Sequence, residues 1–244
     1  MRNRIFDAFL TSLRTRRELG RTAPLAGVAI FAIAVALPVI SAQAAESDSF
    51  ETAAVSARRI TAEDGVAPGT GTLSAGLDLD LGEGWKTYWR SPGEVGLAPE
   101  IIWDGSRNIA NVDFLWPAPE RFTAFGIENF GYKSEVVFPL RVTLKTPGTA
   151  AHLQARVKLL TCSEVCVPQD FKLGLSIPAG TGIDQGSAAR ITVFADKVPS
   201  DAASADIVLA EAHLDDSSTA LTVHLRRETP FRQADLFPEM GRDT

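Results

Sequence analysis

The sequence predicts an all-β protein, in which an immunoglobulin-like antiparallel β-sandwich is followed by a short helix and a partial second β-domain. Two observations support this fold class. Apolar residues alternate with small or polar residues over several short segments, which is typical of half-buried strands. Turns rich in glycine and proline separate these segments, at residues 82–84, 91–93 and 147–148. Six or more short strands at this spacing favour a sandwich of immunoglobulin type, with a barrel as the competing architecture.

The strands of the predicted sandwich differ in the strength of their pattern. Three segments show the clearest alternation: 73–81, 153–159 and 171–177. Residues 51–60 and 100–103 are weaker candidates. Residues 136–145 form a further candidate, and Pro139 places that strand at a sheet edge or a bulge because proline has no amide hydrogen for the ladder.

The first 44 residues are expected to be a cleaved signal peptide. Basic residues precede an apolar run over residues 23–40, and the Ala42-Gln43-Ala44 sequence fits cleavage before Ala45. A retained membrane anchor is the alternative, because the run approaches the roughly 20 residues that span a bilayer. Cleavage removes six basic and two acidic residues, which moves the formal net charge from −6 to about −10. So acidic a protein is not expected to bind nucleic acid.

Three regions follow the signal peptide. They are a sandwich domain, a helical linker and the start of a truncated second β-domain, over residues 45–180, 181–198 and 199–244. We expect the helix over residues 187–197, with Ser187 as its N-cap. Alternation over residues 207–212 and 220–225 predicts two more strands, and two strands alone do not make a stable domain.

Cys162 and Cys166 are the only cysteines of the chain. Cysteines this close in an exported protein readily form a disulfide, and a hairpin would bring them within bridging distance. Closing so short a loop contributes about 2 kcal/mol of stability, against about 4.7 kcal/mol for a loop of 100 residues. The pair is therefore better suited to being formed and broken than to stabilising the fold. A structural disulfide and a Cu(I) site made by the two thiolates are the alternatives.

Four segments around these cysteines resemble a known family. They are Gly84–Gly96, Trp116–Phe122, Glu128–Glu135 and Cys162–Pro168. In this order they resemble the N-terminal periplasmic domain of the thiol:disulfide interchange protein DsbD family. The similarity is greatest to the ScsB-like branch, which is encoded in copper-tolerance operons.

The resemblance implies a periplasmic protein-disulfide reductase domain that relays electrons through the Cys162–Cys166 pair without a cofactor or metal. A membrane electron-transfer domain of a DsbD or ScsB-like protein would reduce the disulfide. The dithiol would then reduce periplasmic thioredoxin-fold proteins, such as disulfide isomerases or cytochrome c maturation factors. By family analogy Cys166 attacks and is attacked, and Cys162 resolves the mixed disulfide. The relatives' membrane segments are absent from this sequence, so we expect a truncated reading frame or a separate polypeptide as the electron source.

The resemblance also assigns a cap loop to Glu128, Asn129, Phe130 and Tyr132, with the Phe130 ring as an apolar lid over the cysteines. Without the resemblance, Phe130 and Tyr132 would be expected in the core. Negative charge at Glu164, between the cysteines, would raise the pKa of a thiol, although Glu164 fits a solvated loop equally well. The alternative function is a non-enzymatic periplasmic β-sandwich module that has a structural disulfide or binds copper through reduced thiols.

Overall fold

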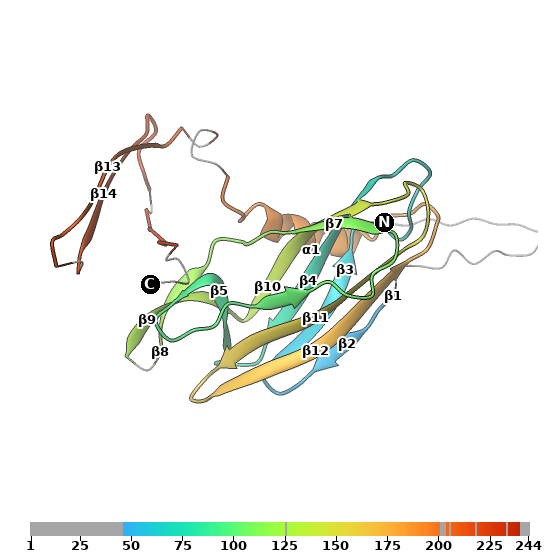
Figure 1. Ribbon diagram of the computed structural model, residues 1–244, viewed down its shortest axis with the longest axis horizontal. Helices are drawn as coiled ribbons and strands as arrows, with labels where there is room; N and C mark the ends of the chain where they lie inside the picture. The colour runs from blue at the N-terminus through green and yellow to red at the C-terminus, as the bar shows by residue number, and fades with distance from the viewer. Residues whose placement is uncertain are drawn as a thin grey trace, which may run out of the picture. The chain divides into compact units, whose positions relative to one another are not determined.

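The computed structural model confirms the antiparallel β-sandwich (Figure 1). It describes residues 46–124, 126–200, 204, 206–217, 219–232 and 234–239. The predicted signal peptide lies outside these residues. No helix within them combines the length and the hydropathy that crossing a membrane requires.

Two sheets form the sandwich. The seven-stranded sheet has the spatial order β1 (Glu46–Ser47), β12 (Cys166–Ile177), β11 (Ala151–Cys162), β5 (Lys86–Gly93), β9 (Ile127–Lys133) and β8 (Glu120–Ala124), with β6 (Glu100–Ile102) also paired to β11. The five-stranded sheet has the order β2 (Ser49–Glu51), β3 (Val55–Thr61), β4 (Thr72–Leu81), β10 (Glu135–Leu144) and β7 (Ile109–Phe114). The clearest alternating segments therefore became β4, β11 and β12.

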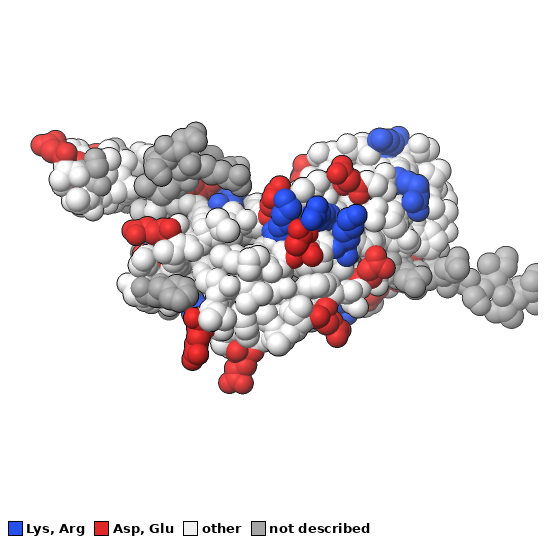
Figure 2. All heavy atoms as spheres, turned by 60° about the horizontal axis from the view of Figure 1, so that its bottom comes forward, with Lys and Arg blue, Asp and Glu red and all other residues white. Residues whose placement is uncertain are grey.

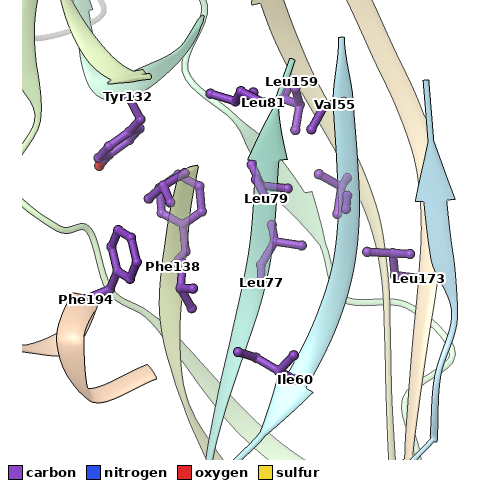
Figure 3. Packing of buried hydrophobic residues seen from close by; sticks show 14 of the residues in the cluster. Val55, Ile60, Leu77, Leu79, Leu81, Tyr132, Phe138, Leu159, Leu173 and Phe194 are labelled. Carbon is purple, nitrogen blue, oxygen red and sulfur yellow. The ribbon is translucent and has the colours of Figure 1, made fainter. Parts of the chain in front are cut away.

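The main hydrophobic core lies between the two sheets. Leu77 and Leu79 of β4 and Phe138 of β10 come from one sheet and are almost completely buried. Leu159 and Leu173 come from the other sheet and belong to the same cluster. Figure 3 shows part of this cluster, to which α1 also contributes. The alternating leucines are buried because period-two side chains line one face of each strand.

The prediction that Pro139 places its whole strand at a sheet edge or a bulge is wrong, although Pro139 itself lies just beyond the end of the ladder with β7. Its strand, β10, lies between β4 and β7. The amide of Leu115 donates to the carbonyl of Pro139 at 2.9 Å, so the nitrogen of Pro139 also faces the β7 side. The β7 strand has already ended at Phe114, so the missing amide hydrogen costs the sheet no ladder bond.

The short strands β5, β8 and β9, which are rich in polar and aromatic residues, were not predicted from the sequence. Residues 91–93 were predicted as a turn and end β5, and most of the predicted cap loop is β9. Residues 51–60 form two strands, because Thr52 makes a turn in which its hydroxyl accepts from the amide of Val55 at 3.1 Å. The strand β5 lacks simple alternation because it contains a bulge between Tyr88 and Gly93.

The helix α1 (Gln185–Ala195) packs against strands of the five-stranded sheet through Ile191 and Phe194, which are buried. Its N-cap is Asp184, so the prediction of Ser187 is wrong. The helix begins three residues earlier than a Ser187 cap would require, and the amide of Ser187 donates to the Asp184 carboxylate at 3.1 Å. Elsewhere the surface mixes both signs of charge, and Figure 2 shows acidic and basic side chains side by side on one face.

Asp184→Ala is expected to lower the free energy of unfolding by about 1 kcal/mol, because the helix loses its N-cap acceptor. Ser187→Ala is the matched control and should cost less, because the Asp184 carboxylate still accepts from the amide of residue 187. Urea denaturation of both variants measures the difference. Equal losses would contradict the assignment of Asp184 as the cap.

A separate two-stranded sheet follows α1. It consists of β13 (Val208–Leu214) and β14 (Leu221–Arg226), close to the predicted strands. Five of its apolar side chains are exposed: Val208, Leu209, Leu214, Leu221 and Leu225. An isolated hairpin is at best marginally stable in water. The assignment of residues 199–244 to a second β-domain stays a prediction.

Candidate redox site

The β11–β12 hairpin brings the two cysteines together. Cys162 and Cys166 are the last residue pair of its ladder and form a disulfide, with their Cα atoms 4.1 Å apart. A tight turn connects them, in which the amide of Ser163 donates to the carbonyl of Val165 at 2.9 Å. The disulfide therefore lies at the tip of a long hairpin whose remaining ladder is independent of it.

The two sulfur-bearing side chains differ in exposure. Cys162 is 2% exposed and clusters with the rings of Tyr88 and Phe122, whereas Cys166 is exposed. Of the two residues, Cys166 is therefore the more accessible to an incoming thiolate, which would leave Cys162 as the leaving group. This is the geometry that stepwise thiol–disulfide exchange requires.

Tyr88 supplies a hydrogen bond to the buried sulfur. Its hydroxyl donates to Cys162 Sγ at 3.2 Å. Burial raises the pKa of Tyr88, so the hydroxyl keeps its proton at neutral pH and remains a donor. Apolar surroundings disfavour a thiolate, and a hydrogen bond to the charged form offsets part of this cost. Tyr88 is therefore placed to stabilise the leaving thiolate.

A row of cross-strand neighbours continues from the disulfide across the sheet. Cys166 pairs with Cys162, Cys162 with Lys86, and Lys86 with Lys133. Directly opposed residues in antiparallel strands present their side chains on the same face. Both lysine ammonium groups also lie 5.9 Å from the centre of the Phe122 ring. Lys133 is paired with Glu120 at 3.5 Å, so the positive charge that would favour an anion on the face of the disulfide comes mainly from Lys86.

Gly131 allows the strands behind the disulfide to approach closely. It pairs with Tyr88, and a Cβ atom at this position would lie 2.0 Å from the carbonyl oxygen of Thr87 and 3.0 Å from the Phe122 ring. No side chain fits into that space without separating β5 from β9. The absence of a side chain at residue 131 therefore helps to hold Tyr88 and Phe122 beside Cys162.

The structure does not bring Phe130 and Tyr132 to the cysteines. Phe130 and Tyr132 alternate with Gly131 and Lys133 along β9. Their side chains therefore point away from the face of the sheet that carries Lys133 and the disulfide. Both belong to the main core cluster, and the Tyr132 hydroxyl donates to the carbonyl of Pro117 at 2.8 Å. The aromatic residues that do cluster with Cys162 are Tyr88 and Phe122. The cap role of Phe130 stays a prediction.

The predicted acidic and polar residues occupy different environments. Glu128 is exposed and forms an ion pair with Arg121. Asn129 is completely buried, and its side-chain amide donates to the carbonyl of Ile127 at 2.9 Å. Glu164 is exposed in the hairpin turn. Within the part of the chain that the structure describes, no three His, Cys, Asp or Glu side chains gather as a metal site.

A groove with a volume of about 1230 Å³ lies beside the hairpin. The segment after the β5 bulge forms part of its wall, including Pro92 and Leu97. The hairpin contributes Leu160 and Pro168, which pair two positions before the disulfide. Val165 and Val167, on either side of Cys166, are also exposed. Apolar surface therefore surrounds the accessible cysteine.

Tyr88→Phe is expected to slow reduction of the disulfide by a small thiol about tenfold, because a hydrogen bond to a charged group contributes about 1.5 kcal/mol. Tyr132→Phe is the matched control, since it removes a buried hydroxyl on the opposite face of the sheet. Stopped-flow reduction under pseudo-first-order conditions gives both rates. If Tyr88→Phe reacts as fast as Tyr132→Phe, the phenol does not assist the leaving thiolate.

Both cysteines could be predicted from the sequence, whereas their neighbours in the site could not. No individual role was predicted for Tyr88, Phe122, Lys86 or Lys133. The available signal was the spacing of Lys86 and Tyr88, which places both on one face of a strand. That signal could be used only if the segment was recognised as a strand next to β11.

Comparisons with known proteins agree with this geometry. A family model described as thiol:disulfide interchange protein DsbD, N-terminal, matches residues 57–176. A second model, described as a domain of unknown function (DUF8393), matches residues 197–244. The chain is similar to the crystal structure of the N-terminal periplasmic domain of ScsB from Proteus mirabilis, with a TM-score of 0.59 and 29% sequence identity over 77% of this chain and 70% of that chain. A comparison with curated proteins finds no match.

Proposed function

Because residues 57–176 form a thiol:disulfide interchange domain of the DsbD N-terminal family, related to ScsB, we propose that the Cys162–Cys166 pair relays electrons to thioredoxin-fold proteins in the periplasm. The observation that carries the proposal is the unequal exposure of the two cysteines, together with the Tyr88 hydrogen bond to the buried one. A purely structural disulfide does not need one accessible sulfur and a hydroxyl donor on the other.

The proposed relay has two exchanges. A thiolate of a membrane electron-transfer domain attacks Cys166 Sγ, the bond to Cys162 breaks, and the electron pair passes to Cys162 Sγ. A second thiol of the donor resolves the mixed disulfide and leaves the dithiol. The Cys166 thiolate then attacks the disulfide of a thioredoxin-fold partner, and the Cys162 thiolate releases the reduced partner and restores the disulfide.

The periplasmic location is part of this proposal. The similar ScsB structure is described as a periplasmic domain, and the sequence predicts a signal peptide. A disulfide that is made and broken also fits an oxidising compartment, where a dedicated electron supply is needed to keep it reduced.

The test is the reduction potential of the Cys162–Cys166 pair together with exchange between the protein and a thioredoxin-fold protein. We expect the protein and the thioredoxin-fold protein to reach thiol–disulfide equilibrium within minutes. Alkylation of the free thiols and gel separation then measure the reduced and oxidised fractions. The Cys162→Ser/Cys166→Ser double variant is the control for unspecific alkylation. A potential below about −300 mV with no exchange would indicate a structural disulfide instead.

A further inference from the structure

A short segment near the C-terminus docks on the sandwich against Trp89 and Phe130, which point away from the face that carries the disulfide. Residues 235–239, which we call the C-terminal strap, follow the β13–β14 hairpin. The ring of Phe237 makes edge contacts with Trp89 and Phe130, with ring centres 6.2 Å and 5.5 Å apart. Phe237 thereby packs against the main core cluster from outside the predicted sandwich domain.

Polar contacts fix the direction of the strap. Arg121 on β8 donates to the carboxylate of Asp235 at 2.8 Å and to the carbonyl of Leu236 at 2.9 Å. Its guanidinium carbon also lies 4.9 Å from the centre of the Phe130 ring and 5.6 Å from that of Phe237. Arg121 therefore links the strap to the β8–β9 hairpin at several points.

Further along the strap, contacts reach the segment of β5 that forms the groove. Arg90 pairs with Glu239, and the hydroxyl of Ser91 donates to the carbonyl of Pro238 at 3.1 Å. Pro238 itself lines the groove, together with Leu160 and Pro168 of the redox hairpin. The strap thus occupies part of the groove whose wall also contains Leu160 and Pro168, a residue pair two positions from the disulfide along the hairpin.

We propose that the C-terminal strap is an intramolecular gate, which a protein partner displaces when it docks in the groove beside Cys166. This inference rests on the proposed exchange with thioredoxin-fold proteins. The strap is suited to displacement because a single partly buried ring, that of Phe237, anchors it, and the gain from burying part of a ring does not exceed the ordering cost of a short segment. Its ion pairs with Arg90 and Arg121 involve partly exposed groups and add little.

Phe237→Ala separates this proposal from a purely structural role of the strap. The variant is expected to be reduced at least about threefold faster than wild type by reduced thioredoxin, which serves as a thioredoxin-fold probe, because the open population increases. Reduction by dithiothreitol should stay within about twofold of wild type, since Cys166 is already exposed and a small thiol needs no groove. Phe231→Ala is the matched control, because the Phe231 ring lies over Arg227.

Amide hydrogen exchange provides a readout that does not depend on redox activity. In the oxidised full chain, Phe237→Ala should increase exchange in β8 and β9, and Phe231→Ala should not. Equal thioredoxin rates in wild type and Phe237→Ala would overturn the gate, as would a slower rate in the variant. If thioredoxin reduces none of the proteins while dithiothreitol reduces all of them, the proposed function fails, and the gate fails with it. If amide hydrogen exchange in β8 and β9 were the same in Phe237→Ala and wild type, that result alone would contradict docking of the strap on the sandwich.

Discussion

Cys166→Ser is expected to abolish exchange with a thioredoxin-fold partner, whereas Cys162→Ser should stop the reaction halfway and accumulate a mixed disulfide. The reason is exposure: Cys166 is open to an incoming disulfide, and Cys162 is 2% exposed behind Tyr88 and Phe122. In Cys162→Ser the exposed thiolate still attacks, but no second thiol remains to release the partner. Non-reducing gels and intact-mass measurement detect the trapped complex.

The two variants control for each other. Each loses the same short disulfide loop, which contributes about 2 kcal/mol by chain entropy, so their stabilities should be similar. Any difference in trapping therefore reports the roles of the two sulfurs. If Cys166→Ser formed the mixed disulfide as readily as Cys162→Ser, the assignment of Cys166 as the attacking cysteine would be wrong.

Gly131→Ala is expected to lower the free energy of unfolding by about 3 kcal/mol and to slow reduction of the disulfide. The added methyl group would lie 2.0 Å from the carbonyl oxygen of Thr87 and 2.9 Å from the Cα atom of Tyr88, and both are backbone atoms. The strands β5 and β9 must therefore move apart. Because Tyr88 is the register partner of Gly131, its hydroxyl should move relative to Cys162.

Gly71→Ala is a suitable control for this substitution. Its Cβ atom would meet only the ring of Pro147, at 3.8 Å, which is an ordinary contact. Urea denaturation and reduction kinetics on both variants measure the two effects. A Gly131→Ala protein within about 0.5 kcal/mol of wild type would mean that the close approach of β5 and β9 is not needed.

The sequence predicted well where burial follows a simple period. The leucines of β4 alternate because one face of the strand lies on the core, and the same holds for Leu173 and Leu175 of β12. The strands β5, β8 and β9 escaped prediction because a bulge, a glycine and buried aromatic residues on both faces remove the alternation. Pairing between distant strands, which places Lys86 opposite Cys162, has no signal in one sequence.

The candidate site shows the same division. Both cysteines could be identified from their spacing and from the expected export, since that chemistry depends on residue type and on compartment. Tyr88 and Phe122 could not, because their contact with Cys162 depends on the order β11, β5, β9 and β8 in the sheet. The cap role of Phe130 was predicted from the resemblance and stays a prediction: its ring belongs to the core cluster and also lines the groove that contains Leu160 and Pro168.

The disulfide joins the last residue pair of the β11–β12 ladder, and this position has a consequence for how partners would recognise the two redox forms. Eleven further residue pairs, from Ala151–Ile177 to Thr161–Val167, hold β11 and β12 in register without it. We therefore expect reduction to preserve the ladder and to alter mainly the atoms at the tip of the hairpin. If the proposed relay is correct, its electron donor and acceptor would have to distinguish the oxidised from the reduced form at the sulfurs, at Tyr88 and at Lys86 and Lys133. In the proposed relay, selection between donor and acceptor would then depend on a few groups at one end of the sandwich.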